Sequence, residues 1–463
     1  MASDYEHNGS DGFLRRPVTR RDFLKTGVLA GAALGVGGAL TGSLAACGTT
    51  SSDSGSSSGS SSGAEGREIK IGFVTPLTGP LASFGIPDAW CVKQWEASVK
   101  DGLKCGDGQV HPIKFIVKDT QSDTNRAAQV TGDLITNDGC DIIMAASTAD
   151  TVPPVADTCE AMAEPCVTND CPWQAYFFGR GGDPAKGFEW TYHSWWGLEG
   201  ITAVFIDMWD SLQTNKKVAE MWPNDGDGLA WADPAKGQPP FLKAGGYTII
   251  DGGRYQDLTD DFTPQIAKFK AAGAQILSGV MLPPDFTNFW KQSLQQGFNP
   301  MIATVGKALL FPQSLEALGT VGYNLSSECW WSPNHPFTSS LTGQTCKQIA
   351  DQYETDNNAQ WTQPILHYAI FEVVADALKR TTNVDDKATI RDAIKATSME
   401  TIGGHIAWDT ADKKLNPVPN VCTTPIVGGQ RVKGTKYPYD LQVVSNKLYP
   451  DIPTQAALQP IKY

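Results

Sequence analysis

The chain of 463 residues has 37 Lys and Arg against 50 Asp and Glu, a formal net charge of −13, and 41% of its residues are hydrophobic. The acidic balance argues against nucleic acid and anionic lipid surfaces as partners, because Lys and Arg drive binding to both. The length is ample for a sizeable core and suggests two or three domains.

The N-terminus has the pattern of an export signal. Residues 19–25 (TRRDFLK) contain a twin-arginine pair, and an uncharged run rich in Gly and Ala follows from Thr26 to Ala46. A basic segment, a weakly apolar segment and small residues at the end are typical of a secretory signal of the twin-arginine (Tat) type. We predict that residues 1–46 are removed on export; a transmembrane anchor is the alternative.

The next segment predicts a lipid anchor. Leu44-Ala45-Ala46-Cys47 resembles a lipobox, in which the cysteine thiol takes diacylglycerol. Gly48–Gly66 then has 9 Ser and 5 Gly among 19 residues, a composition typical of a flexible tether. Residues 47–67 are therefore expected to be a lipidated Cys47 with its linker, holding the protein at the outer face of the cytoplasmic membrane.

Nine cysteines follow Cys47, so at least one is free or paired between molecules. Export implies a compartment that permits disulfides, although a chain that folds before export can keep reduced thiols. The connectivity stays open. Three local pairs are plausible: Cys91 with Cys105, Cys159 with Cys166, and Cys329 with Cys346.

Strands and helices are expected to alternate from residue 69 onward. Ile69–Thr75 is a short apolar run rich in β-branched residues, which predicts a buried strand. The expected elements after it are a helix at 84–99, a strand at 113–118, a helix at 125–136, a strand at 140–146, a helix at 152–162 and a strand at 165–168. Strands separated by helices predict βαβ units and a parallel sheet.

The pattern restarts after the aromatic connector Phe188–Trp196. Expected helices lie at 198–212, 262–272, 285–296, 341–354, 365–380 and 387–396, and expected strands at 217–222, 247–251, 275–280, 301–304, near 328 and at 440–444. Two similar α/β lobes follow from this order. Ligands of open α/β sheets bind beyond the carboxyl ends of the strands, so we expect the site in a cleft between the lobes.

Ile71–Gly85 (IGFVTPLTGPLASFG) resembles the beginning of the leucine/isoleucine/valine-binding proteins of ABC importers. The resemblance covers the chain from Glu68 to Tyr463. It continues at Asp119–Ser122, Ala146–Thr148, Pro172-Trp173, Gly297–Pro300 and Gly403–Asp409. It implies a type I periplasmic-binding-protein fold, with two Rossmann-like α/β lobes that have parallel-sheet cores and are joined by three crossovers.

The crossovers are expected near Tyr192, near Glu328 and between Trp408 and Pro417. Lobe 1 is then residues 68–193 plus 329–408, and lobe 2 is residues 194–328 plus 409–463. Closure of the two lobes on a ligand is a hinge motion.

Eight residues are candidate ligand contacts: Phe84, Ser147, Thr148, Trp173, His193, Asp225, Leu282 and Lys307. Ser147 and Thr148 stand at the head of a helix, where hydroxyl and backbone N–H groups suit a carboxylate, as the resemblance also implies; a plain N-cap is the alternative. Phe84 and Trp173 are aromatic candidates that could instead belong to the core. His193 lies at the first crossover beside Trp195 and Trp196, where packing at the hinge is the alternative.

The second lobe contributes an acidic turn, an apolar residue and a lysine. Asp225 in the turn 224–228 (NDGDG) could hold a cation or an ammonium group, or be a solvated turn. The resemblance aligns Leu282 with a tyrosine that touches the ligand, and Gly306-Lys307 with an acidic residue that pairs with the ligand's ammonium. A Lys307 that faces inward would favour an organic acid over an amino acid; a Lys307 in solvent would not.

No catalytic or metal-binding pattern occurs in the chain: the six His have no H-E-x-x-H partners, and the Cys lack metal-ligand spacing. We therefore expect no enzymatic activity, no metal and no cofactor. The resemblance implies a monomeric solute-binding protein, which captures a small polar molecule and delivers it to an ABC permease. The solute classes in view are branched-chain amino acid-like molecules, amides, and organic or aromatic carboxylates. A secreted enzyme on the same scaffold and a ligand-sensing domain are the alternatives.

Overall fold

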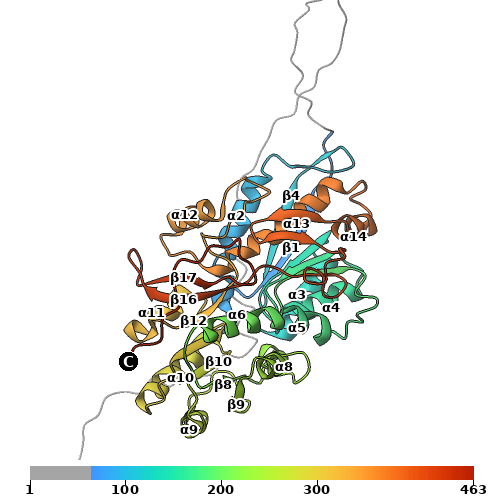
Figure 1. The fold of residues 1–463 in the computed structure, drawn as a ribbon. Coiled ribbons are helices and arrows are strands. Elements are labelled where there is room, and N and C mark those ends of the chain that lie inside the picture. Colours follow the sequence, from blue (N-terminus) through green and yellow to red (C-terminus); the bar gives the residue numbers. More distant parts are fainter. Residues whose placement is uncertain (1–63) are drawn as a thin grey trace, which may run out of the picture. The chain divides into compact units, whose positions relative to one another are not determined.

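The computed structural model describes residues 64–463, which belong to one compact unit with two main sheets (Figure 1). The expected export signal, Cys47 and nearly all of the tether lie outside the described residues. No helix within the described residues has the length and apolar character needed to span a membrane.

The first sheet has six strands in the order β15-β7-β6-β5-β1-β4, all parallel, and we call this sheet with its helices lobe 1. Its strands are β1 (Ile69–Thr75), β4 (Ile113–Asp119), β5 (Ile142–Ala145), β6 (Cys166–Asn169), β7 (Thr191–Ser194) and β15 (Val421–Cys422). Its helices are α1 (Ala82–Gly85), α2 (Asp88–Ser98), α3 (Thr124–Thr136), α4 (Val152–Ala161), α5 (Trp173–Gly179), α12 (Cys346–Asn357), η2 (Gln363–His367), α13 (Tyr368–Arg380) and α14 (Lys387–Lys395). Two short hairpins flank them, β2 (Leu103–Lys104) with β3 (Val110–His111), and β13 (Ser398–Thr401) with β14 (Gly404–Ala407).

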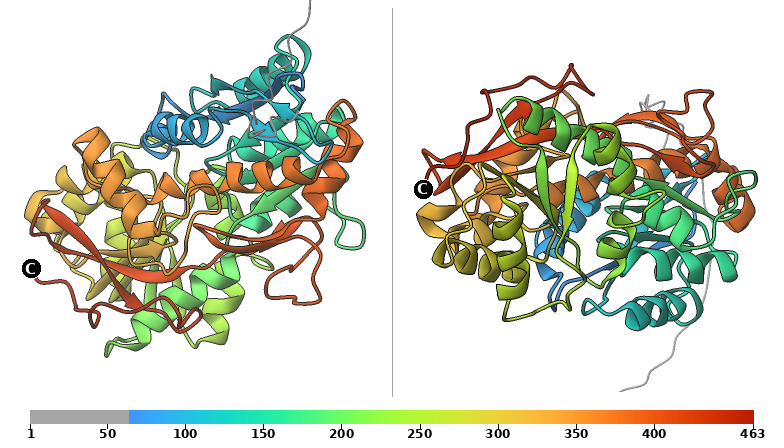
Figure 2. Two further views of the ribbon diagram at one scale, coloured as in Figure 1. Left: turned by 90° about the horizontal axis from the view of Figure 1, so that it is seen from above. Right: turned by 60° about the horizontal axis from the view of Figure 1, so that its bottom comes forward.

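The second sheet has seven strands in the order β17-β16-β12-β11-β10-β8-β9, and with its helices it forms lobe 2. Its strands are β8 (Lys217–Met221), β9 (Thr248–Asp251), β10 (Ile276–Val280), β11 (Ile302–Gly306), β12 (Ser326–Cys329), β16 (Val427–Lys433) and β17 (Tyr439–Ser445). Its helices are α6 (Leu198–Asp210), α7 (Gly226–Trp231), α8 (Gln238–Ala244), α9 (Thr263–Ala272), α10 (Pro283–Gln295), α11 (Pro312–Glu316) and η1 (Gly319–Gly322). Figure 2 draws the antiparallel pair β16 and β17 in red, at the edge of this sheet.

Strand β1 shows why the sheet is covered on both faces. Ile71 and Phe73 belong to the core cluster that contains α2 and α13, and Phe73 meets Trp95 edge-on with ring centroids 5.2 Å apart. Val74 belongs to the cluster formed with α3 and α4. Alternate residues of a strand point to opposite faces, so a strand buried on both faces is apolar throughout. The predicted α/β class and the strand at 69–75 are confirmed.

The chain changes sheet at places that differ in part from those expected. The aromatic connector contains a strand, β7, which pairs with β6 in lobe 1. The third crossing comes after Cys422 rather than between Trp408 and Pro417, because β15 adds to lobe 1 beside β7. His193 N–H donates to Asn420 O (2.9 Å), and Trp195 N–H donates to Cys422 O (3.0 Å).

The nine cysteines that the structure describes are all buried and free, so none of the three plausible pairs forms a disulfide. The thiols of two of these pairs contact backbone carbonyl groups instead. Cys91 Sγ lies 3.9 Å from Ile365 O, and Cys346 Sγ lies 3.5 Å from Ile402 O. Burial raises the pKa of the Cys346 thiol to about 12, which disfavours the thiolate needed for disulfide exchange.

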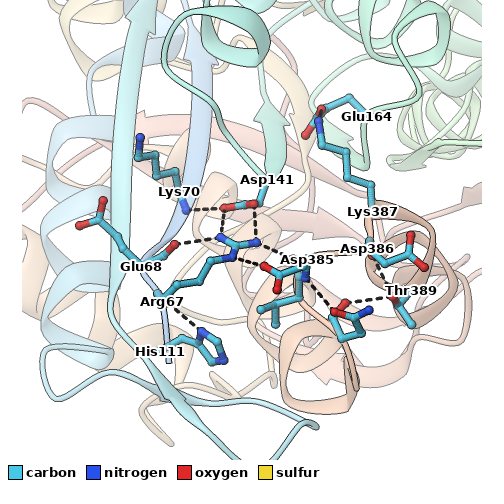
Figure 3. Close-up of polar contacts among 12 residues, drawn as sticks. Arg67, Glu68, Lys70, His111, Asp141, Glu164, Asp385, Asp386, Lys387 and Thr389 are labelled. Atoms are coloured by element: carbon cyan, nitrogen blue, oxygen red, sulfur yellow. Dashed lines mark hydrogen bonds and ion pairs between the residues drawn. The ribbon is translucent and has the colours of Figure 1, made fainter. Parts of the chain in front are cut away.

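Arg67, just before β1, fixes the start of the described chain to lobe 1 (Figure 3). Its guanidinium donates to Asp141 (2.8 Å) and to Asp385 (2.5 Å), so it joins the segment before β5 to the loop before α14. Close by, the Lys387 ammonium pairs with the buried carboxylate of Glu164. The described residues that follow the tether are therefore fixed to lobe 1.

Candidate functional site

A small cavity of about 30 Å³ lies between the lobes, beyond the carboxyl ends of their strands. It is lined by Phe84, Thr148, Asp170, Pro172, Trp195, Trp196, Asp227, Trp231, Val280, Lys307, Leu310, Glu328 and Trp330. That volume holds about two water molecules, since one needs roughly 10–15 Å³. Binding of an organic solute therefore requires the lobes to separate and close again around it.

The backbone is strained where the strands reach this cavity. Ser147 (φ 72°), Thr148 (φ 94°), Asp170 (φ 56°) and Lys307 (φ 68°) all have left-handed or nearby positive φ values. Such values are uncommon outside glycine, and for a β-branched residue such as Thr148 they are outliers. Strained residues gather at ligand clamps and active sites, so this cluster supports a functional role for the cleft.

Lys307 points inward and is only 5% exposed, but its charge is already compensated. Its Nζ lies 2.8 Å from Asp227 Oδ2, 3.5 Å from Asp225 Oδ2 and 3.8 Å from Asp150 Oδ2. Burial alone would lower the pKa of Lys307, but the three carboxylates outweigh it and raise that pKa well above its usual range. The side chain is thus no free receptor for an anion, which removes the basis for preferring an organic acid.

The same three carboxylates join the two lobes. Asp150 follows β5 in lobe 1, and its Oδ1 accepts a hydrogen bond from the N–H of Gly226 in lobe 2 (2.9 Å). Asp225 is the N-cap of α7 and accepts from Gly228 N–H (2.6 Å), so residues 226–231 form a helix where a solvated turn was an alternative. The carboxylates are close enough together to hold a cation, and the Lys307 ammonium occupies that position.

A second buried charge network ends at the cavity. His367 Nδ1 lies 2.7 Å from Asp88 Oδ1, and its Nε2 lies 3.0 Å from Asp170 Oδ2. Burial opposes the charge on His367, but the two aspartates outweigh it and raise the pKa of His367 to about 9. Ser147 Oγ also donates to Asp170 Oδ2 (3.4 Å). The hydroxyl expected to hold a ligand carboxylate therefore faces a carboxylate of the protein.

Glu328 at the end of β12 is only 2% exposed and lines the cavity. Its Oε1 accepts from Lys307 N–H (3.1 Å), whereas its Oε2 has no hydrogen-bond partner within residues 64–463. Burial raises the pKa of Glu328 to about 7. A buried oxygen without a partner is costly, so this atom is available to a ligand.

Four tryptophans, Trp195, Trp196, Trp231 and Trp330, form much of the remaining wall. Trp195 and Trp330 come from the first and second crossovers and meet with ring centroids 4.7 Å apart. All four indole Nε1 atoms are buried without an acceptor among the described residues. The high tryptophan content is a sequence signal that points to this wall, but nothing local in the sequence distinguishes these four from core tryptophans.

Five of the eight candidate residues do not line the cavity, and three of these, Trp173, His193 and Leu282, have other roles in the fold. Trp173 donates its indole N–H to Glu199 Oε1 (2.8 Å) at the first crossover. His193 is buried in β7, stacks on Tyr176 at 4.1 Å, and has its pKa lowered to about 3 by burial. Leu282 is buried in the core at the start of α10.

The other five candidates meet at the cleft. Thr148 and Lys307 line the cavity, Ser147 and Asp225 contact residues that do, and Phe84 lines it while meeting Phe311 of lobe 2 edge-on at 4.8 Å. Whether these residues bind the ligand stays a prediction. Sequence reasoning missed Asp170, Glu328 and Trp231.

Replacing Trp173 with phenylalanine separates a structural role from a ligand contact. We expect the free energy of unfolding to fall by about 1–2 kcal/mol, because the half-buried Glu199 loses one charge-assisted hydrogen bond. Urea unfolding measures that loss, and a solute titration should show unchanged affinity. An affinity that falls tenfold with unchanged stability would instead make Trp173 a ligand contact.

A larger groove of about 690 Å³ lies on lobe 1, between α14 and the segment before β15. Charged side chains of both signs line it, among them Glu189, Arg391 and Lys413. Arg391 there pairs with Glu189 and lies over the ring of Trp190, 4.6 Å from its centroid. This arginine is thus partnered within the protein, whereas Glu328 Oε2 in the cleft has no partner among the described residues.

Comparisons with solved structures agree with this architecture. A leucine-binding protein, LivK, from Thermotoga maritima shares 16% identity, with a TM-score of 0.64 over 83% of this chain and 99% of that one. LivJ from Streptococcus pneumoniae, solved with isoleucine, shares 18% identity, with a TM-score of 0.63 over 82% and 99%. A solute-binding protein from Rhodopseudomonas palustris, solved with 4-hydroxybenzoate, shares 17%, with a TM-score of 0.65 over 82% and 96%.

These identities are low, so the likeness shows the fold: the type I architecture with two lobes, as the resemblance implied. The sequence itself matches the family described as periplasmic binding protein over residues 68–419, about three quarters of the chain. That match includes all of the residues that line the cavity. The chain therefore belongs to the periplasmic binding protein family.

Proposed function

We propose that the protein is the extracytoplasmic solute-binding component of an ABC importer. It captures a small polar solute in the cleft and presents the closed form to a permease. The observation that carries this proposal is the cavity itself: two lobes meet around buried polar atoms that lack partners among residues 64–463, Glu328 Oε2 and four indole N–H groups. Proteins whose structures were solved with isoleucine and with 4-hydroxybenzoate share the fold.

The N-terminal sequence extends this proposal to location. The twin-arginine pattern, Cys47 and the Ser/Gly tether support export followed by lipid anchoring on the outer face of the cytoplasmic membrane. The described chain begins at Ala64, whose carbonyl accepts from Val110 N–H of lobe 1, so the tether joins lobe 1 and lobe 2 is free to move on the hinge. We propose a monomer that works in this anchored state.

The proposal is tested by titrating the purified protein with amino acids, amides, carboxylates and organic cations. We expect one class to change tryptophan emission saturably, because Trp195, Trp196, Trp231 and Trp330 line the cavity. At 100 times the Kd, that ligand should stabilise the fold by about 2.7 kcal/mol. Small-angle scattering should show compaction on binding. A protein that no solute stabilises, but that hydrolyses an ester or amide, would contradict the proposal.

A further inference from the structure

The charge around the cavity identifies the class of solute, an inference that rests on the proposed binding function. Six carboxyl groups line the cavity or belong to the two charge networks that end at it: Asp88, Asp150, Asp170, Asp225, Asp227 and Glu328. Three cations face them: Lys307, His367 and Arg431. The excess of acid disfavours an anionic solute in a desolvated cleft and favours a cation.

None of these three cations is available to a ligand. Lys307 is held by three aspartates, and His367 lies between Asp88 and Asp170. The buried guanidinium of Arg431 donates to the backbone carbonyls of Leu309 and Leu310. Glu328 Oε2, by contrast, is buried and has no partner within residues 64–463.

The walls of the cavity favour an organic cation over a metal ion. Hard metal ions require several oxygen ligands, whereas four indole rings form much of this wall. Tryptophan faces are the best aromatic partners for ammonium groups, and cages of such rings recognise alkylated ammonium. The indole N–H groups, which can only donate, can pair with a hydrogen-bond acceptor on the same ligand.

A free α-amino acid fits this arrangement less well. Its carboxylate would lie at Ser147 and Thr148, where Asp170 already receives the Ser147 hydroxyl. A second carboxylate there would be repelled. We therefore propose that the ligand is a small alkylated ammonium cation that carries a neutral hydrogen-bond acceptor, held by Glu328, Asp170 and the four tryptophans.

The test compares choline with 3,3-dimethylbutan-1-ol, in which carbon replaces the charged nitrogen while the shape and the hydroxyl group are kept. Acetylcholine adds a carbonyl acceptor, and leucine and 4-hydroxybenzoate represent the other charge classes. By calorimetry on the purified protein, we expect choline or acetylcholine to bind at least tenfold more tightly than the carbon analogue, leucine and 4-hydroxybenzoate. This comparison uses the unaltered protein and so needs no variant to fold.

A substitution then tests whether the Glu328 carboxylate is the group that holds the cation. Glu328→Gln should lower the affinity for the cation at least tenfold and leave the affinity for the carbon analogue unchanged. Glu164→Gln is the matched control, because Glu164 is also buried with one unpartnered oxygen but pairs with Lys387 away from the cavity. If Glu328→Gln and Glu164→Gln bind the cation with equal affinity, Glu328 does not hold the cation.

The remaining outcomes separate this inference from the proposed function. Tighter binding of leucine or 4-hydroxybenzoate, or equal affinity for choline and its carbon analogue, would overturn the cation assignment but leave a solute-binding protein. No binding of any of these solutes, nor of the wider set tested above, would count against both.

Discussion

Replacing Lys307 with methionine is expected to destabilise the protein by about 3–5 kcal/mol at pH 7, the usual cost of removing one partner from a buried ionic cluster. Asp150, Asp225 and Asp227 would remain, with carboxylate oxygens within 4.8 Å of one another and no cation between them. Asp150 belongs to lobe 1 and the other two to lobe 2, so their repulsion acts directly on closure. We therefore expect loss of the closed form as well as a lower free energy of unfolding.

The variant leaves other features of the site unchanged. The positive φ of residue 307 is as unfavourable for methionine as for lysine, so backbone strain cancels in the comparison. Lys307→Met/Asp227→Asn should recover part of the stability by removing one charge. Acid should also narrow the difference in stability between wild type and Lys307→Met, because burial already raises the pKa of Asp227 to about 6 and its carboxylate is then protonated at low pH. Lys433→Met is the control, because Lys433 is exposed at the end of β16.

Urea unfolding at pH 5 and pH 7 and small-angle scattering measure these effects. A Lys307→Met protein that unfolds like wild type at pH 7 would show that solvent screens the three aspartates. A stable variant that still compacts with ligand would show that closure does not depend on this cluster.

Local sequence patterns predicted the parts of the fold that depend on burial and on the spacing of apolar residues along the chain. The apolar run of β1 is buried because helices cover both faces of its sheet, and such runs are recognisable without a structure. The short β15 was missed because it has two residues and no strand pattern of its own. It exists through backbone bonds to β7, more than 220 residues earlier in the chain.

The site was predictable in position but not in its charge balance. Lys307 was expected in the cleft, yet its partners Asp150 and Asp227 lie about 80 residues away or more, on separate elements. Only the fold brings them together, and they reverse what a lone lysine would imply about the ligand. For the same reason, Glu328 was expected only at the end of a strand and at a crossover, and not as a ligand contact. Its importance comes from an oxygen without a hydrogen-bond partner among the described residues, and the lack of a partner depends on every group packed around that oxygen.

The second large effect concerns His367 and the pH dependence of stability. Its pKa is raised to about 9 in the folded protein, against about 6.5 in an unfolded chain. A raised pKa means that the folded state holds the proton more tightly. The stabilisation is therefore fully present below pH 6.5 and is lost as pH rises through 9. The shift corresponds to about 3 kcal/mol between these limits.

His367→Gln isolates this contribution. Buried thiols such as Cys422, with a pKa raised to about 12, also destabilise the fold in alkali, but they do so in both proteins. We expect wild type to be more stable than the variant at pH 6.5, and the difference to shrink by about 3 kcal/mol by pH 10. Urea unfolding across that range measures it. The exposed His405 provides the control variant His405→Gln, which should follow wild type at every pH.

The outcome bears on the ligand as well as on the fold. A charged His367 compensates Asp88 and Asp170 and so allows Asp170 to stay ionised at the cavity. Stability curves of wild type and His367→Gln that run parallel from pH 6.5 to 10 would mean that the buried histidine is neutral throughout. Asp88 and Asp170 would then lack a cation between them, so one of the two carboxyl groups would be protonated and the cleft would hold less negative charge. The preference for a cation would rest on Glu328 and the tryptophans alone.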